Sequence, residues 1–211
     1  NFTISAWVKP DGIQDEYTGI VMADGTAAGL NFRPDNQLAY HWPGGQWWWN
    51  SGLTVPADVW SHVAMVIEPN AITVYLNGVA STHNITPTPV DINTMKIGSY
   101  QAWGGRNFRG EIDEVCLWNE ALNQDQIREL RHLTRTGPTP YTDDLLAYYQ
   151  FNLPNTVIIN DRVGLNHATM AGNAQKVNSS APVGGGVRDR IQISSDGEVL
   201  FPNTQTSMTL P

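Results

Sequence analysis

The stretch Phe2-Thr-Ile-Ser-Ala-Trp-Val-Lys-Pro10 indicates the fold class, because every second side chain from Phe2 to Val8 belongs to one apolar series. Such alternation is typical of a β-strand with one face in a core. The turn sequence Pro10-Asp-Gly12 ends this run, and Asn77-Gly78 is a strong hairpin signal between two further runs. Short strand patterns continue to residue 118 without intervening helical patterns. We therefore predict an all-β protein, an antiparallel two-sheet sandwich.

One short helix is predicted after these strands. Asn123 is a candidate N-cap, with Gln126 three residues later as in a capping box. Apolar residues then follow at near-helical spacing, and Gly137-Pro138 ends the pattern. We expect a β-sandwich over residues 1–136, a linker over residues 137–142 and a C-terminal extension over residues 143–211.

Composition excludes several classes of partner. The 211 residues include 12 basic and 20 acidic side chains, for a net charge of −8. Nucleic-acid binding requires clustered basic residues, so nucleic acid and anionic membranes are poor partners. No apolar stretch approaches the length of a membrane-spanning helix, so we expect no membrane insertion.

Cys116 is the only cysteine, and its apolar neighbours predict a buried, inert thiol.

Five further motifs follow the first strand pattern in order: Trp60-Ser-His62, Val74-Tyr-Leu-Asn-Gly78, Lys96-Ile-Gly-Ser99, Phe108-Arg-Gly-Glu-Ile-Asp-Glu-Val115 and Leu117-Trp-Asn-Glu-Ala-Leu122. Together they resemble the laminin-G-like, concanavalin-A-like jelly-roll domains over roughly residues 2–133. The resemblance implies a two-sheet jelly roll that ends in a helix. Domains of this family serve many functions, so function has to be argued from individual residues.

The C-terminal part resembles the opening strands of the same family, at Leu145–Asn152, Asp161–Gly164 and Asn166–Thr169. It either begins a second module or packs onto the first as a closing layer. We favour docking, because a sandwich that lacks a strand has an exposed edge. The segment Ala181-Pro-Val-Gly-Gly-Gly-Val187 resembles tails of multi-domain bacterial surface proteins. This resemblance implies a secreted parent protein at the cell surface, whose neighbouring domains are candidate partners.

Tryptophan is unusually concentrated around residues 42–49. In a strand, Trp47 and Trp49 would share one face and Trp48 the other, so at least one indole should be exposed. Flat sugar faces stack on such rings, and nearby polar groups bind the hydroxyls. The alternative is that the indoles fill the core. Tyr40 is a further candidate, and the predicted ligand-binding residues are Trp42, Trp47, Trp48, Trp49, Trp103 and Arg106.

The segment Glu111-Ile-Asp113-Glu114 raises the question of catalysis. Laminarinase-type glucanases, which share the fold that the resemblance implies, carry Glu-x-Asp-x-x-Glu on one strand. Here Cys116 occupies the final acid position, so the required carboxylate pair is not assembled. We therefore predict that the protein is not an enzyme. The resemblance also implies a structural calcium ion, for which Asp113 is a candidate ligand and Asp161 a partner if the tail docks.

We predict an extracellular carbohydrate-binding or adhesion module of a larger surface protein. Its partner would be a glycan or cell-surface polysaccharide, bound by exposed tryptophans and polar loops with calcium support. The main alternative is a structural spacer or assembly module, with buried tryptophans and no pocket. A glycoside hydrolase is the third hypothesis, and it requires paired carboxylates in an open cleft.

Overall fold

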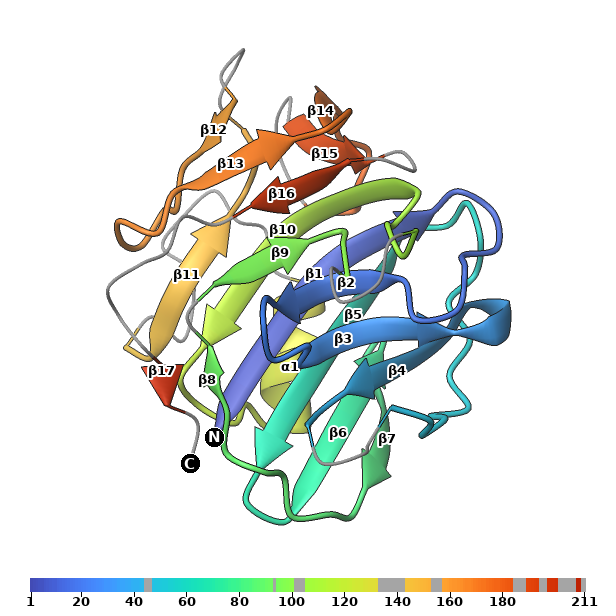
Figure 1. Cartoon of the computed structure of the whole chain (residues 1–211), viewed down its shortest axis with the longest axis vertical. Helices are drawn as coiled ribbons and strands as arrows, with labels where there is room; N and C mark the ends of the chain where they lie inside the picture. Colours follow the sequence, from blue (N-terminus) through green and yellow to red (C-terminus); the bar gives the residue numbers. More distant parts are fainter. Residues whose placement is uncertain are drawn as a thin grey trace.

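The computed structural model describes residues 1–43, 47–92, 94–100, 105–132, 143–152, 157–183, 189–193, 197–200 and 208–209. Within these residues the strands form two stacked antiparallel sheets, and one helix lies outside the stack (Figure 1). The predicted all-β, two-sheet sandwich with a short helix is confirmed for this part of the chain. The predicted linker at residues 137–142 lies outside the described residues.

The first sheet has eight strands in the described part of the chain, and β1 and β10 lie at its centre. The pairing of β1 with β10 runs from Thr3–Trp118 to Pro10–Gly110. The other edge of β1 pairs with β5, and two hairpins then continue to β7. The strands lie in the order β14 (Gln175–Asn178), β15 (Asp189–Ile193), β10 (Gly110–Trp118), β1 (Phe2–Pro10), β5 (Ser61–Glu68), β6 (Ala71–Leu76) and β7 (Val79–His83), with β11 (Leu145–Tyr149) also on β10.

The second sheet has seven strands in the described residues. Its strands lie in the order β12 (Ile158–Ile159), β13 (Ala168–Ala171), β16 (Glu198–Leu200), β9 (Met95–Ile97), β2 (Gly19–Ala23), β3 (Gly29–Arg33) and β4 (Gln37–His41). The segment Pro34–Asn36 joins β3 to β4 as a short turn, in which Asp35 and Asn36 have positive φ. Two short strands, β8 (Asp91–Ile92) and β17 (Met208–Thr209), pair separately.

The predicted hairpin at Asn77-Gly78 joins β6 to β7. Both residues have positive φ, 52° for Asn77 and 79° for Gly78. A two-residue turn with positive φ at both positions matches the right-handed twist of the strands, and Asn-Gly is the pair that adopts it most readily. This local sequence therefore fixes the register between β6 and β7.

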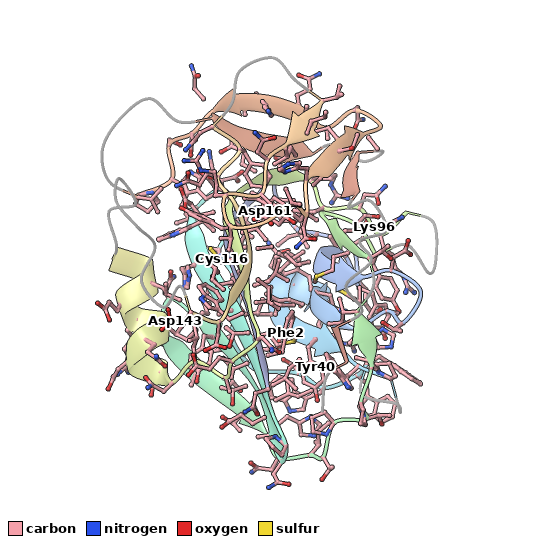
Figure 2. All side chains as sticks on the ribbon, turned by 90° about the vertical axis from the view of Figure 1, so that its left-hand side faces the viewer. Phe2, Tyr40, Lys96, Cys116, Asp143 and Asp161 are labelled. Atoms are coloured by element: carbon pink, nitrogen blue, oxygen red, sulfur yellow. The ribbon has the colours of Figure 1, made fainter. Side chains whose placement is uncertain are left out.

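Alternate side chains from the two sheets fill the space between them. Figure 2 shows Phe2 of β1 between the sheets, and Ile4 and Val8 are buried in the same core. Leu30 and Phe32 of β3 are core residues from the opposite sheet. Burial of one large apolar side chain contributes about 1.5–3 kcal/mol, so this shared core holds the sheets face to face.

The helix α1 (Gln124–His132) begins with the predicted capping box. Asn123 Oδ1 accepts the backbone N–H of Asp125 and of Gln126, both at 3.0 Å, and Gln126 Oε1 accepts the Asn123 N–H at 2.8 Å.

The apolar side of α1 packs on the outer face of the first sheet and forms a second apolar cluster there. Its members include Cys116, Trp118, Leu122, Ile127 and Leu130. Cys116, the single cysteine of the sequence, is buried in this cluster. Among the described residues, no helix has the length and apolar character needed to cross a membrane.

The C-terminal strands extend both sheets of the N-terminal part. One edge of β10 is shared, because β15 pairs with residues 110–112 and β11 pairs with residues 115–118. Glu114 lies between the two pairings with a φ of 53°, which marks a local irregularity in β10. In the second sheet, β16 pairs with β9. Side chains of the C-terminal part, including Tyr149 and Phe151, are buried in the same core as β1.

Asp161 holds the turn that follows β12. Its Oδ1 accepts the backbone N–H groups of Tyr148 and Val163, both at 3.0 Å. Its Oδ2 accepts those of Gly164 at 3.1 Å and Asn166 at 3.4 Å. The side chain is buried, so the carboxylate ties the turn to β11 away from solvent.

We expect Asp161→Ala to lower the free energy of unfolding by roughly 3 kcal/mol, because it leaves buried N–H groups without an acceptor. Asp161→Asn retains one oxygen and should lose less. Urea denaturation of the three proteins measures the difference. Equal stability of Asp161→Ala and the wild type would contradict this role.

Candidate functional site

The outer face of the second sheet, opposite the core, has a polar and aromatic character. Because Leu30, Phe32 and Tyr40 point into the core, alternation places Asn31 of β3 and His41 of β4 on the outer face. The loops before β2 and after β9 run beside this face. The backbone N–H groups of Gly19 and Tyr100 both donate to the carbonyl oxygen of residue 106, each at 3.2 Å, which ties the two loops together.

A pocket of about 420 Å³ opens at this place, and we call it the aromatic pocket. The residues that line it come from four separate segments of the chain and are Tyr17, His41, Trp47, Tyr100 and Arg106. Four of these side chains are rings and one is a cation. The lining therefore combines flat apolar faces with hydrogen-bond donors, as is usual in binding sites for small polar molecules.

Two tyrosine rings hold the guanidinium of Arg106. Its Cζ lies 4.7 Å from the ring centroid of Tyr17 and 5.0 Å from that of Tyr100. These cation–π contacts fix the side chain within the pocket wall. Arg33 also lies over Tyr17, at 4.9 Å, and it forms an ion pair of 2.6 Å with Glu16.

His41 is neutral at physiological pH. Burial and, to a smaller extent, the positive charge of Arg106 lower the pKa of His41 to about 4. Its Nδ1 lies 2.5 Å from the Tyr100 hydroxyl, and the pKa of that hydroxyl is raised, chiefly by burial. A neutral imidazole and a protonated phenol both bind by hydrogen bonds. Arg106 is therefore the charged member of the pocket lining in the described residues.

Of the three consecutive tryptophans, two lie at the surface and one packs against the core. Trp47 is 42% exposed and Trp48 is 58% exposed, and their rings meet edge to face at 5.3 Å. Trp49 packs against the core and stacks on His83, with ring centroids 5.2 Å apart. The segment lies outside the strands, so strict alternation does not apply to it. Trp49 anchors the segment and leaves its two neighbours at the surface.

The other predicted aromatic ligands are placed differently. Trp42 is 1% exposed, and its indole N–H donates to the Thr88 carbonyl at 2.7 Å. An indole enclosed in this way presents no face to a ligand. Trp42 is therefore a core residue, and the prediction that it binds a ligand is wrong. Tyr40 is likewise buried, with its hydroxyl 2.7 Å from His83 Nδ1. Trp103 lies outside the described residues.

The two predicted calcium ligands have other partners. Asp113 is buried, its Oδ1 accepts the Glu114 N–H at 2.8 Å, and its Oδ2 accepts the Ser179 hydroxyl at 2.6 Å. Asp161 accepts four backbone N–H groups, as described above. Calcium requires six to eight oxygen ligands, and the hydrogen bonds to these two carboxylates reduce the lone pairs that remain for a cation. Among the described residues, no group of three acidic, histidine or cysteine side chains is arranged to hold a metal. Calcium binding stays a prediction that this geometry does not support.

The carboxylates of β10 are not arranged around a cleft. Glu114 is buried, and its Oε2 accepts the hydroxyl of Tyr148. Glu111 lies 3.7 Å from Lys9 in an ion pair. Neither residue lines the aromatic pocket in the described part of the chain. The geometry that a glycosidase needs, two carboxyl groups facing one open space, is therefore not formed by these residues.

A second depression of about 360 Å³ adjoins the aromatic pocket, because Tyr100 lines both. Lys96 of β9 lies in it, 3.9 Å from Asp24. Figure 2 shows Lys96 on the outer side of the second sheet. Its lining residues are Met22, Ala23, Asp24, Gly25, Ala27, Lys96, Ser99 and Tyr100.

Of the residues that line the aromatic pocket, the sequence analysis names Trp47 and Arg106 as candidates but not Tyr17, His41 or Tyr100. A strict two-residue period through β4 would have placed His41 on the outer face, opposite Tyr40. Tyr17 has a φ of 65° in the loop before β2, and no sequence pattern signals that conformation. Tyr100 reaches the pocket only through the pairing of distant loops.

The architecture defines a concanavalin-A-like sandwich with an aromatic pocket on the outer face of one sheet. Residues 1–128 match the concanavalin A-like lectin/glucanases superfamily, and the chain belongs to this laminin-G-like family. No curated protein matches the sequence.

Several solved structures are similar to this chain. A proposed carbohydrate binding protein from Bacteroides ovatus is 18% identical with a TM-score of 0.63, over 98% of this chain and 54% of that chain. Domain 4 of AbnA, a GH43 extracellular arabinanase from Geobacillus stearothermophilus in complex with arabinotriose, is 22% identical with a TM-score of 0.47, over 61% and 65%. A Trypanosoma rangeli sialidase mutant is 21% identical with a TM-score of 0.49, over 60% and 22%. The present chain thus spans about half the length of the Bacteroides ovatus protein.

We expect Trp49→Ala to destabilise the protein by about 2 kcal/mol, because it removes a packed, partly buried indole. Trp48→Ala should change the free energy of unfolding by less than about 0.5 kcal/mol, because this ring is largely exposed. Chemical denaturation of both variants tests the anchor role of Trp49. Equal effects of the two substitutions would contradict it.

Stability should fall as the pH drops from about 6.5 to about 4. The folded pKa of His41 is about 4, below the ordinary 6.5, so the unfolded chain takes up the proton first in this window. Above pH 6.5 the contribution of His41 is constant. His83 acts in the same direction, since burial lowers its pKa. Denaturation curves of wild type, His41→Gln and His83→Gln across this range separate the two contributions. An unchanged pH slope in His41→Gln would rule out the assignment.

Proposed function

We propose that the protein is a carbohydrate-binding module and that the aromatic pocket is its glycan site. One observation carries the proposal: Trp47 presents a large exposed ring at the rim of a pocket lined by hydrogen-bonding groups. Sugar rings have flat C–H faces that pack on aromatic rings and hydroxyls at their edges. A site that offers both kinds of contact matches this chemistry.

The anchoring of the tryptophan segment favours binding over a purely structural role. The buried Trp42 lies at one end of the segment and the packed Trp49 at the other. Trp47 is thus held near His41, with ring centroids 5.4 Å apart. A preorganised ring loses little conformational freedom when a ligand binds, which preserves affinity. A spacer module would not require an exposed ring held in this position.

Family membership and the Bacteroides ovatus neighbour, described as a proposed carbohydrate binding protein, support the same function. We further propose that the module acts without catalysis in a secreted surface protein and that its partner is a cell-surface polysaccharide. The engagement of Asp113 and Glu114 in buried hydrogen bonds supports the absence of catalysis by β10. The length of the Bacteroides ovatus protein supports a larger parent.

The first test is a panel of purified polysaccharides and oligosaccharides, with binding measured by isothermal titration calorimetry. Trp47→Ala should weaken binding at least about tenfold, because the loss of a stacking ring costs about 1.4 kcal/mol or more. Trp48→Ala is the matched control, since Trp48 is exposed but does not line the aromatic pocket in the described residues. Its affinity should stay within about threefold of the wild type.

Repetition with calcium and then with a chelator tests the metal hypothesis separately. We expect equal affinity under both conditions, because the two candidate carboxylates accept other hydrogen bonds. A loss of binding with the chelator would restore a role for calcium. A panel on which no saccharide binds would reject the proposed function and favour a structural module.

A further inference from the structure

The side chains that line the aromatic pocket in the described part of the chain can all donate a hydrogen bond, and none of them is an acid or an amide. The guanidinium and the indole carry donors and no acceptor. A neutral histidine and a tyrosine can both donate and accept, so their protein partners decide what they offer to a ligand. The hydrogen bonds of Tyr17, His41 and Tyr100 therefore determine the chemistry of the pocket.

The hydroxyl of Tyr100 fixes the position of the ring proton of His41. Tyr100 is buried, and its Oη lies 2.5 Å from His41 Nδ1. Arg106 also acts on this hydroxyl by a hydrogen bond, and a guanidinium can only donate. The hydroxyl hydrogen therefore goes to Nδ1, because a buried O–H without an acceptor would cost stability. Burial lowers the pKa of His41 to about 4, so the ring is neutral at physiological pH and its single proton lies on Nε2.

The pocket thus contains an N–H group of His41 that a ligand can meet. Among the described residues, Nε2 of His41 has no hydrogen-bond partner and is not one of the buried polar atoms that lack one. The ring lies edge to face with the exposed Trp47, with centroids 5.4 Å apart, so the donor is close to the proposed stacking surface. Tyr17 is a second donor, because its Oη accepts Nη1 of Arg33 at 2.6 Å and keeps its own hydrogen for a ligand.

A pocket with this lining favours a ligand group that accepts hydrogen bonds and brings no donor of its own. The hydroxyl of a plain sugar brings a hydrogen, and the described lining has no acid or amide side chain to accept it. A polar group that is imperfectly paired in a complex reduces affinity. An acetyl group has a carbonyl oxygen with two lone pairs and a methyl group that packs on aromatic rings. It therefore matches both the donors and the rings.

We propose that the aromatic pocket holds the acetyl group of an acetylated sugar unit, with its carbonyl oxygen on the Nε2–H of His41 and the sugar ring on Trp47. This inference rests on the proposed carbohydrate function and specifies its ligand class. N-acetyl and O-acetyl sugars share the carbonyl and the methyl group, so both belong to this class. Tyr100 is a positioning residue, because it sets the tautomer of His41 through Nδ1.

The first test compares saccharides that differ only in the acetyl group. The trisaccharide of N-acetylglucosamine and cellotriose have the same ring configuration and linkage and differ in one substituent on each ring. N-acetylgalactosamine with galactose, and O-acetylated xylo-oligosaccharides with the same sample after alkaline deacetylation, are the other pairs. Each is titrated calorimetrically into the full chain. We expect an acetylated ligand to bind at least about tenfold more tightly than its unacetylated partner.

Two substitutions of His41 form a matched pair. The side-chain amide of glutamine can reach the position of Nε2–H, whereas the shorter amide of asparagine replaces Nδ1 only. His41→Asn should weaken binding of the acetylated ligand at least about tenfold and change binding of its partner by less than about threefold, and His41→Gln should retain part of the preference. Trp48→Ala is the control, because Trp48 is exposed and does not line the pocket in the described residues.

A spectroscopic measurement tests the role of Tyr100 without any ligand. The ring nitrogen chemical shifts of His41, measured by NMR at neutral pH, report which nitrogen carries the proton. We expect the proton on Nε2 in the wild type and a mixture of both tautomers in Tyr100→Phe, together with a smaller preference for the acetylated ligand. A proton on Nδ1 in the wild type would overturn the proposal.

The binding outcomes separate this proposal from the proposed function. Equal affinity within every pair, with loss of binding in Trp47→Ala, would overturn the acetyl assignment and leave carbohydrate binding intact. A preference that persists unchanged in both His41 variants would overturn the assignment of the carbonyl oxygen to His41. Absence of binding by every saccharide would reject both proposals. Thermal unfolding of each variant checks that the fold is retained.

Discussion

The pairing of β10 with its neighbours is the constraint on which the rest of the structure depends. One edge of β10 pairs with β1 along its length, and the other edge is divided between β15 and β11. Its inward side chains Ile112, Val115 and Leu117 lie in the main core, while Cys116 and Trp118 lie under the helix. A central strand buried on both faces and paired on both edges leaves no open edge there. The C-terminal strands are thus part of the same sandwich that β1 begins.

The position of the candidate site follows from the alternation of side chains in the second sheet. Core residues of β3 and β4 fix which side chains face outward, and His41 then forms one wall of the aromatic pocket. The loops that carry Tyr17 and Arg106 meet because Gly19 donates to the Arg106 carbonyl. The packed sheet therefore supplies a rigid floor, and the binding groups come from loops held against it.

The fold could be predicted to a greater extent than the site, and the reason is physical. Strand alternation at Phe2–Val8, the Asn77-Gly78 turn and the capping box at Asn123 are local, and each forms as expected. The site depends on contacts between residues far apart in the chain. Arg106 meets Tyr17 only because β9 pairs with β2 and brings their flanking loops together. The sequence shows which residue types are available for such a pocket, but it does not show which distant residues come together. The sequence analysis therefore places Trp42 among the ligand-binding residues and misses Tyr17.

Asn31 on β3 carries a buried side-chain amide that costs stability. It is fully buried on the same side of β3 as Arg33, and neither its Oδ1 nor its Nδ2 has a hydrogen-bond partner within the described part of the chain. A buried amide without partners costs about 1–3 kcal/mol, and an apolar residue of similar size would avoid that cost. Thr3 and Asp161, by contrast, have hydrogen-bond partners where they are buried. Asn31 does not line the aromatic pocket in the described residues. Ser5 Oγ and Trp7 Nε1 of β1 are likewise buried without a hydrogen-bond partner in the described part of the chain, so such costs occur in both sheets and are not particular to the candidate site.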